Sequence, residues 1–73
     1  MCLGVAAQVI QIMANGVATV DVNGNQTDIS IKLTPEVELG QFVLVHAGFA
    51  MEIIDEQVAA ETISYMKELG WYD

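Results

Sequence analysis

Two Asn-Gly pairs constrain the fold of this chain more than any other feature of its sequence. Asn15-Gly16 and Asn23-Gly24 each separate two stretches that are rich in Val and Ile. Both residues of such a pair readily take the positive φ angles that a tight hairpin turn requires. The sequence therefore predicts two successive hairpins, which join three antiparallel strands into a meander.

The third strand of this meander is predicted from a strict alternation of polar and apolar residues. The apolar positions are Ile29, Ile31 and Leu33, and the polar positions are Asp28, Ser30 and Lys32. This alternation is typical of an antiparallel strand with one face in the core and one face in water. We expect the strand to end at Thr34-Pro35, because proline cannot donate a hydrogen bond to the sheet.

Two further strands are expected in the second half of the chain. Residues 41–47 are apolar on both faces, which predicts a central, covered strand, and residues 50–54 could form a short fifth strand. Between them, Gly48-Phe49-Ala50 has two interpretations. It is a β-bulge or corner that turns the chain, or it is an exposed apolar contact beside His46.

Residues 55–69 have the pattern of a helix. Asp55 is suited to cap its first turn, and Gly70 is suited to the left-handed position after its end, from which Trp71 would fold back on Met66. The predicted apolar face consists of Val58, Ala59, Ile63, Met66 and Leu69. The acidic face, with Glu56, Glu61 and Glu68, is interpreted as solvated or as a docking surface for a basic partner. We expect Met13, Met51 and Met66 to fill the core.

Together these elements predict a single domain of residues 1–73, with a β-barrel over residues 3–54 and the helix over residues 55–69. The fold class is mostly β: a small, OB-like, partly open antiparallel barrel with one C-terminal helix. A three-stranded meander with a separate two-stranded ribbon uses the same signals and stays an alternative.

Composition narrows the possible functions. The 73 residues carry 2 Lys and 10 acidic residues, a net charge of −8, so nucleic acid and anionic membrane surfaces are poor partners. One cysteine cannot form an internal disulfide, and no basic residue precedes Lys32, which argues against a secretory signal and for a cytoplasmic protein. No nucleophilic triad or glycine-rich phosphate loop is visible, so we expect no enzyme.

Cys2 and His46 are the candidate metal ligands. A thiolate next to the chain terminus can approach a metal without a cleft, and a neutral imidazole can bind the same kinds of metal. Each residue also has a plain structural interpretation. Cys2 is then an inert terminal residue, and His46 is a core-edge residue hydrogen-bonded to backbone. Two ligands are too few to hold a metal tightly, but they suit a transient site completed by a partner.

Two segments resemble a known family. The opening Met1-Cys2-Leu3-Gly4-Val5 and the stretch of residues 40–50, GQFVLVHAGFA, are similar to the two signatures of the HypC/HupF/HybG hydrogenase maturation chaperones. The resemblance runs over essentially the whole chain. Two departures are Ala6, where the family usually has a proline, and Gln8, where it often has a basic residue. Loss of the proline removes a restraint on the backbone after the cysteine.

The resemblance implies a chaperone without turnover of its own. Such proteins bind a HypD scaffold, on which iron acquires cyanide and carbon monoxide, and escort the Fe(CN)2CO group to the large-subunit precursor of a nickel–iron hydrogenase. Carried over to this chain, the iron ligands are Cys2 and His46, and the iron is shared with the partner. The expected partner contacts are Cys2, Leu3, Gly48, Phe49 and Ala50. The alternatives are an acidic β-barrel interaction adaptor and a thiol or metal-storage protein, neither with a hydrogenase role.

Overall fold

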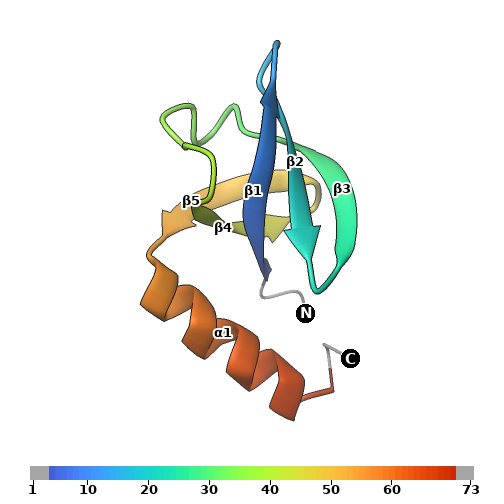
Figure 1. Ribbon diagram of the computed structural model, residues 1–73, viewed down its shortest axis with the longest axis vertical. Helices are drawn as coiled ribbons and strands as arrows, with labels where there is room; N and C mark the ends of the chain where they lie inside the picture. Colours follow the sequence, from blue (N-terminus) through green and yellow to red (C-terminus); the bar gives the residue numbers. More distant parts are fainter. Residues whose placement is uncertain (1–3, 71–73) are drawn as a thin grey trace.

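The computed structural model describes residues 4–70, without the side chains of residues 56–59. Five strands precede one helix (Figure 1). They are β1 (Val5–Met13), β2 (Val17–Val22), β3 (Asn25–Ser30), β4 (Phe42–His46), β5 (Phe49–Ile54) and α1 (Glu56–Glu68). The bounds of α1 agree with the helix predicted over residues 55–69.

The five strands form a closed barrel in the order β1-β2-β3-β5-β4. All neighbouring strands are antiparallel except β3 and β5, which pair in parallel through Ser30 and Phe49 alone. The predicted mostly-β, OB-like barrel is confirmed. The separate two-stranded ribbon is excluded because β4 pairs with β1 over four residue pairs. The barrel is closed, whereas a partly open barrel was expected. The closure between β3 and β5 consists of one residue pair.

Both Asn-Gly pairs form the predicted hairpin turns. The φ angles are 67° at Asn15, 73° at Gly16, 51° at Asn23 and 87° at Gly24. A third hairpin joins β4 to β5 through Ala47 and Gly48, whose φ angles are 54° and 81°. Positive φ at both residues matches the twist of the two strands. Gly48 therefore belongs to a tight turn, which agrees with the predicted corner that turns the chain at this point.

The third strand is shorter than predicted. β3 ends at Ser30, and the next residue, Ile31, donates its amide to the Gly16 carbonyl at 2.8 Å. Ile31 stays buried, but the chain then turns, with the amide of Thr34 donating to the carbonyl of Ile31. Leu33 consequently lies in a turn with 57% of its surface exposed, so its predicted place on the core face is wrong.

Two bulges shift the register of the barrel strands. Between the pairs Val9–Val20 and Gln11–Thr19, β1 has one extra residue, Ile10. β5 has one extra residue, Met51, in the same way. A bulged residue loses its inward alternation. Met51 is accordingly 48% exposed, and its predicted role as core filler is wrong.

The barrel core is built from small and β-branched side chains. Its members are Ala7, Val9, Ala18, Val20, Ile29, Ile31, Val37, Val43 and Ala50, all buried to 5% exposure or less. A narrow five-stranded barrel has room for few large side chains, which explains the alternation of Ala and Val along the strands. The strands are therefore held in a tightly packed frame.

The helix covers the outer side of β1 and β4 (Figure 1). This packing explains why residues 41–47 are apolar on both faces. Met66 is buried at 4% exposure, as predicted, whereas Leu69 is 62% exposed, so its assignment to the apolar face is wrong. Gly70 has φ 82° and donates its amide to the Lys67 carbonyl, which confirms the predicted helix end. The side chains of Val58 and Ala59, and Trp71, lie outside the described residues.

No helix among residues 4–70 has both the length and the apolar character needed to cross a membrane.

Candidate functional site

His46 is the last residue of β4 and lies on the surface. It is paired across the β4–β5 hairpin with Phe49, the first residue of β5. The imidazole makes no hydrogen bond to the part of the chain that the structure describes. A buried core position is therefore excluded, and His46 is accessible to a metal or to a partner.

Gly4 brings the beginning of the chain next to His46. The β1–β4 ladder begins with the pair Val5–Val45, so Gly4 lies beside the end of β4. Gly4 is buried with φ 85°, and a Cβ atom there would lie 3.0 Å from Leu44 Cγ and 3.1 Å from the Val45 carbonyl oxygen. Only glycine fits this close approach without strain. Cys2 and Leu3 lie outside the described residues.

The strand registers connect His46 to a longer row of side chains. Val17 pairs with Ser30, Ser30 with Phe49, and Phe49 with His46, so that one row crosses β2, β3, β5 and β4. Side chains of paired residues point to the same side of a sheet. Each is at least partly exposed, which shows that the row faces outward. We call these four residues the outer row.

The predicted partner contacts divide between the surface and the core. Gly48 lies in the exposed β4–β5 turn, and Phe49 is 44% exposed. Ala50 is fully buried in the barrel core. A direct contact of its side chain with a partner is incompatible with that position, because β5 alternates inward and outward at this point.

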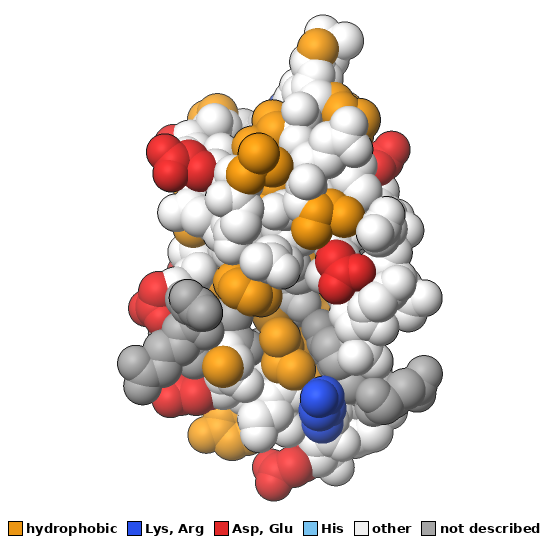
Figure 2. Space-filling model, in the orientation of Figure 1, with side chains coloured by type: hydrophobic (Ala, Val, Ile, Leu, Met, Phe, Trp, Pro, Cys, Tyr) orange, Lys and Arg blue, Asp and Glu red, His pale blue; other side chains and the backbone are white. Residues whose placement is uncertain are grey.

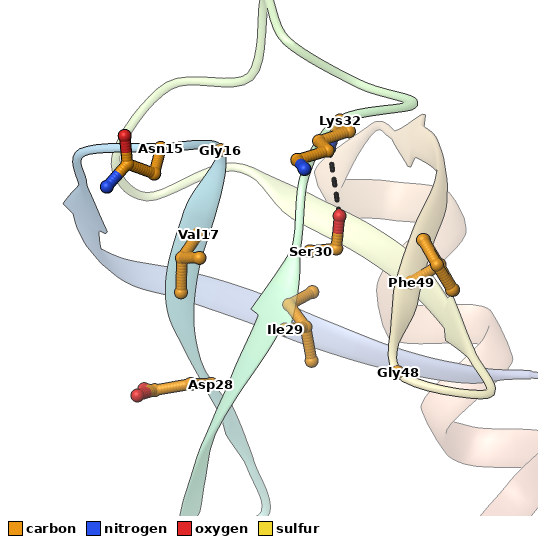
Figure 3. A pocket seen from close by; sticks show the side chains of 9 residues that line it. All are labelled: Asn15, Gly16, Val17, Asp28, Ile29, Ser30, Lys32, Gly48 and Phe49. Atoms are coloured by element: carbon orange, nitrogen blue, oxygen red, sulfur yellow. Dashed lines mark hydrogen bonds between the residues drawn. The ribbon is translucent and has the colours of Figure 1, made fainter.

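The outer row contains a hollow at its centre (Figure 3). The small Ser30 lies between the larger Val17 and Phe49, and the resulting groove has a volume of about 390 Å³. Lys32 lies at one end of it and Asp28 at the other (Figure 3). Sequence reasoning missed this groove, because it forms only when the β3–β5 seam brings Phe49 beside the first hairpin.

The described residues contain no group of three or more His, Cys, Asp or Glu side chains that could hold a metal ion. His46 therefore belongs to no such group among residues 4–70.

The fold and site define a class of protein: a small closed β-barrel with a C-terminal helix, with its candidate functional residues His46, Gly48 and Phe49 on the surface. The chain belongs to the HupF/HypC family, whose family model matches residues 1–66. This confirms the resemblance expected from the two sequence segments.

Several curated relatives are similar over nearly their whole length. The hydrogenase maturation factor HypC of Synechocystis is 39% identical, with 96% of this chain and 99% of the relative covered. The hydrogenase maturation factor HybG of Escherichia coli K12 is 40% identical, with 97% and 94% covered. The Frd operon uncharacterized protein C of Proteus vulgaris is 40% identical, with 96% and 79% covered. The first two names describe maturation factors and not enzymes, in agreement with the prediction for this chain.

Proposed function

We propose that this protein is a cytoplasmic hydrogenase maturation chaperone, which helps to assemble the Fe(CN)2CO group and delivers it to a large-subunit precursor. The observation that carries the proposal is that Gly4, near the N-terminus, lies next to an exposed histidine. Gly4 lies beside the end of β4, where His46 faces outward. Family membership and the names of the relatives support the same role.

The thiol of Cys2 is the proposed primary ligand of the iron cargo. Cys2 is two residues before Gly4 in the sequence, and we propose that its thiol acts together with His46. Thiolate and imidazole are both suitable iron ligands.

An incomplete ligand set is what a delivery protein requires. A site with four protein ligands would retain the metal, whereas one thiolate and one imidazole can pass it on when a partner supplies the rest. The proposed partners are a HypD-like scaffold, from which the iron is collected, and the hydrogenase large-subunit precursor, to which it is given. Exposed Gly48 and Phe49 provide docking area beside the ligands.

Long-range attraction does not bring the cargo to this protein. Iron with two cyanide ligands is electron-rich and anionic, and the chain has a net charge of −8. Capture therefore depends on direct ligation and on contact with the partner, where short-range bonds outweigh the repulsion. We expect cargo transfer inside a protein complex and not through free solution.

Replacement of Cys2 tests the proposal. Cys2→Ala and Cys2→Ser should both abolish hydrogenase maturation in a strain lacking the wild-type gene, because neither side chain can ligate iron as a thiolate does. Hydrogenase activity and co-purification of the scaffold protein are the two measurements. Full maturation with Cys2→Ala would contradict the mechanism.

His46 separates ligation from docking. His46→Ala should lower the iron content of the purified complex more than it lowers scaffold binding, because an exposed imidazole contributes little to folding. The matched control is Met51→Ala, which removes another exposed side chain close by in β5. Equal loss of iron and binding, with a lowered melting temperature, would instead assign His46 a structural role.

A further inference from the structure

We propose that the groove of the outer row is a second docking point for the partner protein, occupied by an apolar side chain with an acidic residue next to it. The inference rests on the proposed function, because the groove is continuous with the edge at which the cargo is held. Phe49 belongs to both: it pairs with His46 on one side and lines the groove on the other. A partner that covers the His46 edge therefore meets the groove next.

The groove has the shape and chemistry to receive one apolar side chain. Its walls include Val17, Ile29 and Phe49, and its volume of about 390 Å³ is within the range of small binding pockets. It exists because Ser30 is the smallest residue of the outer row. Figure 3 shows these residues on the three strands that meet at the groove, with Val17 and Phe49 on either side of Ser30. Burial of a partner's Leu or Phe there would remove apolar surface from water on both sides.

Lys32 explains why the partner's apolar side chain should have an acidic residue next to it. The sequence has two cations, Lys32 and Lys67, and Lys67 lies in the last turn of α1. Lys32 makes no ion pair with the residues that the structure describes, although the chain has ten acids. Its stem lies against Gly16, where a Cβ atom would come within 2.9 Å of Lys32 Cγ. The aliphatic stem of Lys32 therefore packs on the first hairpin beside the groove.

Negative charge is also spread over the surface outside the groove. On the face drawn in Figure 2, acidic groups lie at the margins of a broken band of apolar side chains. A carboxylate of the partner is repelled by the net negative charge of this protein. In the barrel, Lys32 is the basic side chain with which it can pair. An ion pair at Lys32 would therefore fix the register of the partner more than it would add affinity.

The test is the affinity of purified scaffold protein for four variants, measured by calorimetry. Lys32→Glu should weaken binding at least tenfold, because it places a second negative charge against the partner's acid. The matched control Lys67→Glu changes net charge equally and should leave binding within twofold. Ser30→Val should also weaken binding by filling the groove, and Gln26→Val, on the same exposed face of β3, should not. Melting temperatures confirm that each variant is folded.

Two results would overturn this inference while leaving the proposed function intact. One is equal binding by the Lys32 and Lys67 variants, together with full loss of maturation in Cys2→Ala. The other is that the isolated chain forms a concentration-dependent dimer, and that Ser30→Val abolishes this dimer without changing scaffold binding. The groove would then hold a second copy of this chain. If Cys2→Ala also leaves maturation unchanged, the proposed function itself fails.

Discussion

The barrel and the helix are held in place in different ways. The barrel packs nine side chains into one core, with Val9, Val20 and Val43 at 1% exposure or less. In α1, Met66 is the one buried apolar side chain among those that the structure describes, while Tyr65 in the helix and Leu69 directly after it are more than half exposed. The strands therefore form a rigid frame, to which the helix is attached at fewer points.

This difference places the candidate site on the rigid part. The outer row is positioned by three strand pairings, and Gly4 by the β1–β4 ladder. A site on a firm frame keeps the same geometry from one partner to the next, which the proposed delivery role requires. The helix covers β1 and β4 from outside and does not contribute to the outer row.

The largest expected effect comes from a cavity in the barrel. Val43→Ala should lower the free energy of unfolding by about 2–3 kcal/mol, because it removes buried methyl groups and leaves a void in a fully buried position. Urea denaturation measures this loss. Met66→Ala should open the helix locally and cost less globally.

Hydrogen exchange distinguishes the two kinds of loss. Met66→Ala should speed exchange in α1 and leave the amides of β1 and β2 protected, whereas Val43→Ala should speed exchange throughout the barrel. Equal acceleration of strands and helix in both variants would mean that barrel and helix unfold as one unit.

Gly4 offers an intermediate effect at the edge of the site. Gly4→Ala should cost about 2 kcal/mol, because the residue has φ 85° and the new methyl group would press on Leu44 and on the Val45 carbonyl. Gly24→Ala is the matched control: its φ is 87°, but nothing lies within 4 Å of the added Cβ. Its cost should be about 1 kcal/mol from backbone strain alone. Equal losses of stability in the two variants would show that the neighbours of Gly4 move aside for the added methyl group at no cost in free energy.

The smallest effect is a gain in stability. Ala47 has φ 54° in the β4–β5 turn, a conformation that a side chain with a Cβ disfavours. Ala47→Gly should therefore raise the free energy of unfolding by about 0.5–1 kcal/mol, which a small upward shift of the melting temperature would record. A fall in stability would mean that the flexibility gained by the unfolded chain exceeds the strain relieved.

Local signals predicted much of the fold. The Asn-Gly pairs specified two hairpins, and the apolar spacing after Asp55 specified α1, because turns and helices depend on neighbouring residues. The bulges at Ile10 and Met51 were missed, since an extra residue in a strand leaves no mark in composition. The turn at Leu33 was missed because the alternating pattern continued through it.

The candidate site was predicted in part. His46 was identified with its strand, and its exposure was left open between two interpretations. The groove was not predicted, because its walls come from β2, β3 and β5, which are brought together by a parallel pairing of Ser30 with Phe49. Ala50 was predicted to contact a partner, but it is buried. The sequence does not show whether the first or the second residue after a turn points into the core.

The most direct test is an infrared spectrum of the complex purified anaerobically with its scaffold partner. The wild-type complex should show bands of iron-bound cyanide and carbon monoxide, and the complex formed with Cys2→Ala should lack them. Cyanide and carbon monoxide bands of unchanged intensity in the Cys2→Ala complex would contradict the claim that the cargo is held by the thiol beside His46.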